Sequence, residues 1–349
     1  MHNSLVAALD IGGTKIAGAL VDGNGAILHR AQCPTPAHDD GETVMRAVES
    51  ILAELTASPL WVRATALGIG SAGPVDASAG TVSPVNVPGW RAFPLVDRVS
   101  HAVGRHLPVT LVGDGVAMTA AEHWQGAARG YDNALCMVVS TGVGGGLVLG
   151  GKPHAGPSGN AGHIGHISVD LDGDLCPCGG RGCVERIASG PNIARRALEN
   201  GWRPGPGGDT SAAAVAEAAR AGDPVATASY ERAAQALAAG IAATATLVEI
   251  EIAVVGGGVA GAGEVLFGPL RRALRDYAAL SFVQRLTVAP AVTGTEKRWW
   301  ALDRFHSWQT RRRYRPSGMS GAPPEGAHSQ VSGPARLRDV PRARPGAVA

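Results

Sequence analysis

The sequence predicts an α/β fold with mixed sheets, on the basis of three recurring patterns. Short apolar runs that end in glycine clusters alternate with helix-prone, Ala-rich segments along the chain. Two of these runs, at 5–21 and 134–150, read as strand, glycine turn, strand. The second run resembles the first run and follows it by about half the chain length. A third run, at 252–258, also ends in glycines. Alternating strands and helices are typical of the α/β class.

Helical periodicity is clearest over 42–57. The apolar residues that share one face of this segment are Val44, Val48, Ile51, Leu52 and Leu55. The remaining elements that we expect are helices at 114–128, 191–200, 211–221 and 225–248 and strands at 65–70, 108–112 and 285–289.

Composition permits a large aliphatic core, because 45% of the 349 residues are hydrophobic but only 4% are aromatic. The opening residues lack a basic head followed by a long apolar run, which argues against a signal peptide. No segment approaches the roughly 18 to 20 apolar residues of a membrane helix. We therefore expect a cytoplasmic protein without membrane contact.

The net charge of +2 conceals a basic tail. Residues 296–349 carry 11 basic and 4 acidic residues, whereas the rest of the chain carries 20 and 25. The tail holds three of the seven tryptophans and then a Pro, Gly, Ser and Arg mixture without periodicity. That composition is typical of disorder. The abrupt change favours a frameshifted end over a natural disordered tail, and the run RRRYR leaves nucleic-acid binding as a weaker alternative.

The first chemical motif is the glycine hairpin at 10–15. Its glycines let the backbone approach a polyphosphate, while Thr14 and Lys15 can donate to phosphate oxygens. Asp10 can hold Mg²⁺ through water. The motif joins two strands and lacks the GK[ST] ending of a P-loop. The alternative is an ordinary glycine hairpin that binds no ligand. The similar run at 141–146 argues against this alternative.

The second motif is a cluster of one imidazole and three thiols that matches a complete tetrahedral Zn²⁺ set. Its members are His166, Cys176, Cys178 and Cys183. Four protein ligands leave no open position for water, so a structural metal is expected. On spacing alone His163 is a rival ligand, and free buried thiols are the non-metal alternative.

The third motif is Asp114, which follows a predicted strand and opens a predicted helix. A carboxylate there can take the proton from a sugar hydroxyl that attacks a γ-phosphate. Asp is also among the best helix N-caps, and on the sequence alone that structural alternative is favoured.

Together these segments resemble the ROK family of sugar kinases and repressors. The match runs from about residue 5 to about 294 and includes DIGGTKIAGALVD, SAGPVD at 71–76, PVNVPGW at 84–90, STGVGGG at 140–146 and VVGGGVAGAG at 254–263. The most specific segment is 161–190, with its His-x9-Cys-x-Cys-x4-Cys pattern.

The resemblance implies an actin-like, ribonuclease-H-like fold of two domains, 1–113 and 114–295, with ATP in the cleft between them and a zinc loop at 163–185. It implies Asp114 as catalytic base and a structural zinc on the four ligands above. The positions implied for ATP are Asp10, Gly12, Gly13, Thr14, Lys15, Thr141, Gly142, Gly144, Gly256, Gly257 and Gly258. Those implied for the sugar are Asn86, Asp114, His163, His166 and Glu185.

The identity of the sugar substrate is less well defined by the sequence than the family is. Family glucokinases usually carry Glu where this chain has His163, and AGHIGH with GCVE and IASG resembles bacterial N-acetylmannosamine kinases. Imidazole can donate as well as accept a hydrogen bond, unlike a carboxylate. N-acetylmannosamine is therefore the first expectation, glucose the second, and another hexose or amino sugar the third.

Two departures from the family bear on activity. The usual Asn-Asp corner is Gly113-Asp114 here, so an amide expected to contact the sugar is absent. A DAGL-type turn and closing helix usually follow the last strand, whereas Thr293-Gly294-Thr295 precedes Glu-Lys-Arg-Trp-Trp. Losing that helix would uncover apolar surface. A catalytically decayed sugar-binding protein is therefore a further alternative.

Partners follow from the same resemblance. DIGGT begins at residue 10, too early for the helix-turn-helix that precedes it in family repressors. We therefore expect ATP and a sugar as ligands, no nucleic acid, and a homodimer or homotetramer.

Overall fold

The computed structural model describes residues 4–104, 106–205 and 207–293. Gly294, Thr295 and the tail at 296–349 lie outside the described residues, and so do the expectations that concern them. Among the residues that are described, no helix combines the length and the apolar composition needed to cross a membrane.

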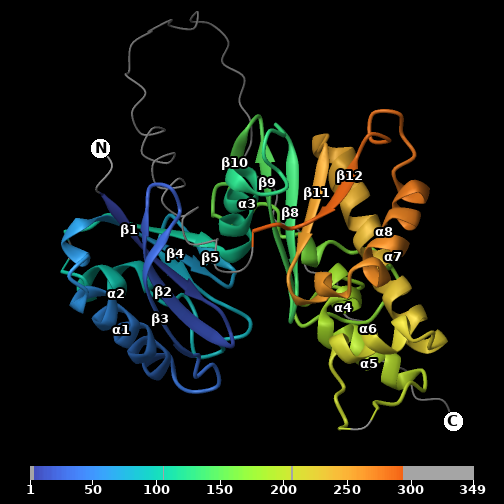
Figure 1. Ribbon diagram of the computed structural model, residues 1–349, viewed down its shortest axis with the longest axis horizontal. Coiled ribbons are helices and arrows are strands. Elements are labelled where there is room, and N and C mark those ends of the chain that lie inside the picture. The colour runs from blue at the N-terminus through green and yellow to red at the C-terminus, as the bar shows by residue number, and fades with distance from the viewer. Residues whose placement is uncertain (1–3, 105, 206, 294–349) are drawn as a thin grey trace, which may run out of the picture. The chain divides into compact units, whose positions relative to one another are not determined.

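Two five-stranded sheets dominate the structure (Figure 1). The first has the order β3-β2-β1-β4-β7, and the second the order β10-β9-β8-β11-β12. The strands of the first sheet are β1 (Leu5–Ile11), β2 (Lys15–Asp22), β3 (Ile27–Pro34), β4 (Ala64–Ser71) and β7 (Val109–Gly113). The strands of the second are β8 (Ala134–Val139), β9 (Val143–Leu149), β10 (Lys152–His154), β11 (Ile252–Gly256) and β12 (Thr287–Pro290).

The two sheets share one pairing pattern. In each, three consecutive strands pair antiparallel and two later strands add in parallel beside the first of them. The glycine turns at 12–14 and 140–142 occupy equivalent places between the first two strands of each sheet. The repeated strand, turn, strand pattern of the sequence is thus a repeated sheet topology.

Helices cover the outer faces of both sheets. The helices are α1 (Gly41–Ala57), α2 (Leu95–Ala102), α3 (Asp114–Gln125), α4 (Val184–Ala188), α5 (Gly190–Glu199), α6 (Ala212–Arg220), α7 (Pro224–Val248) and α8 (Glu264–Tyr277). The five apolar residues predicted for one face of α1 are all buried there, in the core of the first sheet. Helices α4 to α8 share the core of the second sheet.

Helix α3 lies between the sheets. Val116 and Ala117 pack with strand residues of the first sheet, whereas Met118 packs with those of the second. Gly115 permits the close approach of α3 to β9, since a β-carbon there would lie 2.4 Å from the carbonyl oxygen of Gly145. The predicted catalytic residue, Asp114, therefore begins a helix held by both sheets.

Short elements complete the chain. A two-stranded sheet pairs β5 (Val75–Asp76) with β6 (Thr81–Val82). Single 3₁₀ turns cover Trp61–Arg63, Ile164–His166 and Gly258–Ala262. The helices and strands expected from the sequence are present, and most show only small boundary shifts. The turn expected over the glycine run at 141–146 is shorter than predicted, because β9 already begins at Val143. β3, β5, β6, β10, α2, α4 and α8 had not been predicted.

Candidate active site

A cavity opens at the N-terminal end of α3. The residues that line it are Gly73, Gly113, Asp114, Gly115, Val116, Gly144, Gly145, Gly159, Asn160, Ala161 and His163. Of the residues predicted to act on substrate, the cavity brings together Asp114, Gly144 and His163. The lining is drawn from both sheets and from the loop that leads to the cysteine cluster, so it unites segments distant in sequence.

Asp114 is the first residue of α3 and is half-buried. The N-cap is Gly113, so the structural alternative in which Asp114 caps the helix does not describe this geometry. Asp114 Oδ1 accepts a hydrogen bond from the backbone N–H of Gly115 at 2.7 Å. A β-carbon on Gly144 would stand 3.7 Å from the same oxygen, which places the carboxylate beside the second glycine-rich strand.

The residues predicted for ATP lie at three strand ends and the turns beside them. Asp10 is the penultimate residue of β1, and Gly12 and Gly13 form a turn closed by the hydrogen bond from the Gly12 N–H to the Lys15 carbonyl at 3.0 Å. Thr14 and Lys15 are exposed beside it. Among the described residues, this hairpin does not contribute to the lining of the cavity around Asp114.

The other two phosphate segments lie close to each other. Thr141 and Gly142 turn from β8 into β9, and Gly144 lies in β9. The last segment, at 256–258, follows β11, and a β-carbon on Gly258 would lie 3.7 Å from the Ser140 hydroxyl. The turns at 140–142 and 256–258 therefore meet at the ends of adjacent parallel strands, which is where backbone amides collect in such sheets.

Asn86 belongs to a well-anchored turn. Trp90 is fully buried, its indole N–H donates to the Gly41 carbonyl at 2.9 Å, and its ring stacks on Phe93 with centroids 4.7 Å apart. The Asn86 side chain is exposed and approaches the phosphate hairpin, since a β-carbon on Gly13 would lie 2.5 Å from its Nδ2. Asn86, predicted to contact the sugar, and Gly13, predicted to contact ATP, are thus neighbours.

Glu185 links two predicted binding segments. Its Oε2 accepts a hydrogen bond from the backbone N–H of Val143 at 2.8 Å. A β-carbon on Gly142 would lie 2.7 Å from the same oxygen. Glu185, on α4, therefore fixes the turn between β8 and β9.

His163 and His166 lie side by side, with ring centroids 5.2 Å apart. Although much of the His163 surface is accessible, the pKa of its imidazole lies below the usual range. The concave surroundings keep water from part of the ring, and His166 acts in the same direction, whereas Glu185 opposes both. The His163 ring faces Gly73, where a β-carbon would come within 3.4 Å of its Cε1.

The predicted metal ligands converge. The ligand atoms of His166, Cys176, Cys178 and Cys183 all lie within 4.8 Å of one another. His166 presents Nδ1 to the Cys176 sulfur at 3.9 Å, and the sulfurs of Cys178 and Cys183 are 3.7 Å apart. His163, the rival on spacing, is not part of this group.

The donor atoms of the cluster fit a bound divalent cation. Burial and the two neighbouring thiols raise the pKa of Cys183 to about 12. Burial also raises the pKa of Cys176, whereas the Gly180 N–H lowers that of Cys178. Crowded thiols that resist ionisation become ligands when a divalent cation stabilises their thiolates. Three sulfurs and one imidazole nitrogen are the donors that Zn²⁺ prefers.

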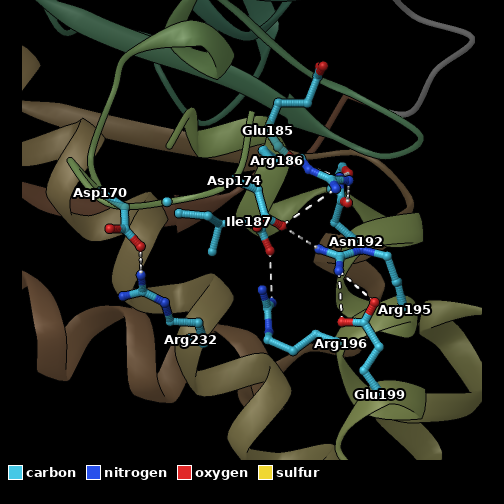
Figure 2. A network of polar contacts seen from close by, with 12 residues as sticks. Asp170, Asp174, Glu185, Arg186, Ile187, Asn192, Arg195, Arg196, Glu199 and Arg232 are labelled. Atoms are coloured by element: carbon cyan, nitrogen blue, oxygen red, sulfur yellow. Dashed lines mark hydrogen bonds and ion pairs between the residues drawn. The ribbon is translucent and has the colours of Figure 1, made fainter. Parts of the chain in front are cut away.

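An arginine network holds the outer part of the cysteine loop (Figure 2). Asp170 pairs with Arg232 of α7 at 2.5 Å, and Asp174 lies 3.2 Å from Arg195 of α5. Asp174 also lies 3.5 Å from Arg186 of α4. These contacts fasten both ends of 170–174 to helices of the second sheet, independently of the sulfur atoms.

Asn160 was not singled out by the sequence analysis, although it lines the cavity three residues before His163. Its side chain hydrogen-bonds to the backbone of Val75. The only available sequence signal was its position directly before the segment 161–190. A side-chain partner 85 positions away cannot be identified from local spacing.

Two sheets of this shared topology, with α3 between them and glycine turns at corresponding strand ends, define an actin-like ATPase fold. The model of the ROK family matches residues 6–297. The chain therefore belongs to the ROK family.

Curated relatives of the chain include sugar kinases. A glucokinase from Thermotoga maritima is 36% identical over 287 residues, which cover 79% of this chain and 88% of the relative. An N-acetylmannosamine kinase from Yersinia pseudotuberculosis is 37% identical over 284 residues, covering 81% and 92%. The structure of a ROK glucokinase from Streptomyces griseus with glucose and AMPPNP matches at a TM-score of 0.73, with 34% identity and coverage of 86% and 99%.

Proposed function

We propose that this protein is an ATP-dependent sugar kinase that phosphorylates the C6 hydroxyl of N-acetylmannosamine. The observation that carries the proposal is the cavity in which the Asp114 carboxylate and the His163 imidazole line one small space. Similarity to sugar kinases over most of the chain supports the reaction class.

In the proposed reaction the C6 oxygen attacks the γ-phosphorus of ATP. The Asp114 carboxylate accepts the hydroxyl proton, the bond from the γ-phosphorus to the bridging oxygen breaks, and ADP leaves. Asp114 suits this role because its place at the start of α3, between both sheets, fixes it without closing it off from the cavity.

We assign the glycine turns to ATP. Backbone amides at 12–15, 141–144 and 256–258 would bind phosphate and adenosine, with Lys15 and Thr14 as side-chain donors. Mg²⁺, with Asp10 holding it through water, would neutralise phosphate charge. The domain boundary at 113/114 and the ATP cleft between the two domains are part of the same proposal.

We assign a structural Zn²⁺ to the Cys3His group. The metal would draw together the two ends of the loop that carries His163, His166 and Glu185, three proposed sugar contacts. His166 presents Nδ1 to the thiols, which leaves Nε2 to meet the sugar. The metal would thereby orient a sugar ligand without contacting the reacting atoms.

The choice of N-acetylmannosamine depends on His163. A neutral imidazole offers one donor and one acceptor nitrogen, which can match an acetamido group or its neighbouring hydroxyl. Glucose is the second candidate, since the chain is 36% identical to a glucokinase.

The test is a coupled ADP-release assay of the full chain with ATP, Mg²⁺ and, separately, N-acetylmannosamine, glucose and N-acetylglucosamine. Turnover that is fastest with N-acetylmannosamine is the expected result. Preference for glucose would replace the substrate assignment. No turnover by a folded, zinc-containing protein would overturn the kinase proposal in favour of a sugar-binding relic.

A further inference from the structure

The side chain of Asn160 joins two loops that are distant in sequence. The backbone N–H of Val75 donates to Asn160 Oδ1 at 3.0 Å, and Asn160 Nδ2 donates to the Val75 carbonyl at 2.6 Å. One carboxamide thus satisfies both polar groups of a buried backbone unit, as a neighbouring strand would. The backbone N–H of Ala77 adds a bond to the Ser158 carbonyl at 3.0 Å.

The close approach of these loops depends on Gly159. Its φ of 95° lies in the left-handed region, which favours glycine. A β-carbon at this position would lie 3.0 Å from Val75 Cγ2 and 3.1 Å from the Ala77 β-carbon. The backbone is therefore shaped to bring Asn160 onto Val75.

The Val75 end of the Asn160–Val75 contact is connected to Asn86 by backbone hydrogen bonds. Val75 opens β5, which pairs with β6, and the Ser83 N–H donates to the Pro74 carbonyl at 2.9 Å. The Val85 N–H donates to the Gly73 carbonyl at 3.4 Å, directly before Asn86. A shift of Val75 is thus transmitted through backbone hydrogen bonds to a proposed sugar contact.

The Asn160 end of the contact lies beside the proposed reacting groups. Asn160 lines the same cavity as Asp114 and His163. Its Nδ2 donates to the Ser158 hydroxyl at 3.1 Å as well as to Val75, so its amide is engaged within the protein. Asn160 would therefore affect a ligand indirectly, by holding the two loops that it joins in place.

We propose that Asn160 is a positioning residue that fixes the distance between two proposed sugar-binding segments, the loop from Val75 to Asn86 and the segment that carries His163. The inference rests on the proposed function, because it takes the ligand bound between these two segments to be a hexose or hexosamine. It predicts that the Asn160–Val75 pair determines sugar affinity and leaves nucleotide affinity unchanged.

The test uses Asn160→Asp in the full chain. Aspartate keeps the shape of the side chain and an acceptor for the Val75 N–H, but its carboxylate cannot donate to the Val75 carbonyl. Loss of that bond, with two oxygens then facing each other, is expected to weaken sugar binding about tenfold. Calorimetry with the three sugars and with Mg²⁺–ADP measures both affinities.

Ser158→Ala is the matched control. It removes a hydroxyl that also accepts from Asn160 Nδ2 but leaves the bonds to Val75 in place. Its sugar affinity should stay within about twofold of the unsubstituted protein. Hydrogen exchange of the backbone at 73–77 should accelerate in Asn160→Asp and not in Ser158→Ala, with no ligand present.

Each possible result either supports or overturns the positioning role of Asn160. Equal sugar affinity in Asn160→Asp and the unsubstituted protein overturns the positioning role alone. An equal loss of sugar and nucleotide affinity also overturns it, since that pattern marks a merely structural residue. Unchanged exchange at 73–77 shows that the pair does not hold the loops. If the unsubstituted protein binds none of the sugars, the proposed function fails and the positioning role fails with it.

Discussion

Glu122 accepts a hydrogen bond from the backbone N–H of Thr293 at 2.7 Å, although 171 positions separate the two residues. The same Oε1 accepts from the Thr293 hydroxyl, and Oε2 accepts from the Ala127 N–H at 2.8 Å. Glu122 lies near the end of α3 and its exposed fraction is 0%. One buried carboxylate thus ties the segment that follows β12 to the helix that begins at Asp114.

Replacing Glu122 by Ala should destabilise the fold. The substitution leaves the buried N–H of Thr293 without its acceptor and also empties the space of the carboxylate. We expect a loss of about 3 kcal/mol or more in the free energy of unfolding, measured by urea denaturation. Glu54→Ala, at an exposed position of α1, should change it by less than about 0.5 kcal/mol. Similar losses in the two variants would contradict this account.

Replacing Asp114 by Asn should abolish turnover and spare the fold. The amide keeps the size of the carboxylate but cannot take the proton of the attacking hydroxyl, so kcat should fall by about 10²- to 10⁴-fold. Asp97→Asn, an exposed change in the first turn of α2, is the matched control and should retain full activity. A normal kcat in Asp114→Asn would exclude the proposed base.

Replacing Cys178 by Ser should release the metal. Zinc content measured by atomic emission should fall from about one ion per chain to near zero, because a four-ligand site depends on every donor. Cys33→Ser changes a thiol of β3 outside the cluster and should keep its zinc. The Cys178→Ser protein should also bind sugar more weakly, and a zinc-free protein with full affinity would refute the proposed link.

Replacing Gly113 by Asn should improve sugar binding. Gly113 has φ of −66°, which any residue adopts, and a β-carbon there meets nothing closer than the Gly159 carbonyl at 3.8 Å. An amide at this corner could contact a hydroxyl in the cavity, so the sugar KM should fall several-fold, by about one hydrogen bond. Gly113→Ala adds the β-carbon without the amide and should leave KM unchanged. A fall in KM with both variants would point to rigidity instead of a contact.

Much of the fold was predictable because its signals are local. The face of α1, the two glycine hairpins and the strand at 252–256 each show their periodicity within a few residues. β3 and α8 were missed for identifiable reasons. β3 alternates polar and apolar residues weakly at a sheet edge, and α8 contains Pro269, which usually interrupts a helical pattern.

Residue type and short spacing were enough to predict the sheet-forming repeats and a metal-type cluster of three thiols with a histidine nearby. The packing of the chain was needed to show that His166, and not His163, joins the three thiols. It also placed Asp114 between two sheets and brought Asn160 onto Val75. These relationships depend on how distant segments pack, because contacts across 85 or 171 positions leave no period in the chain.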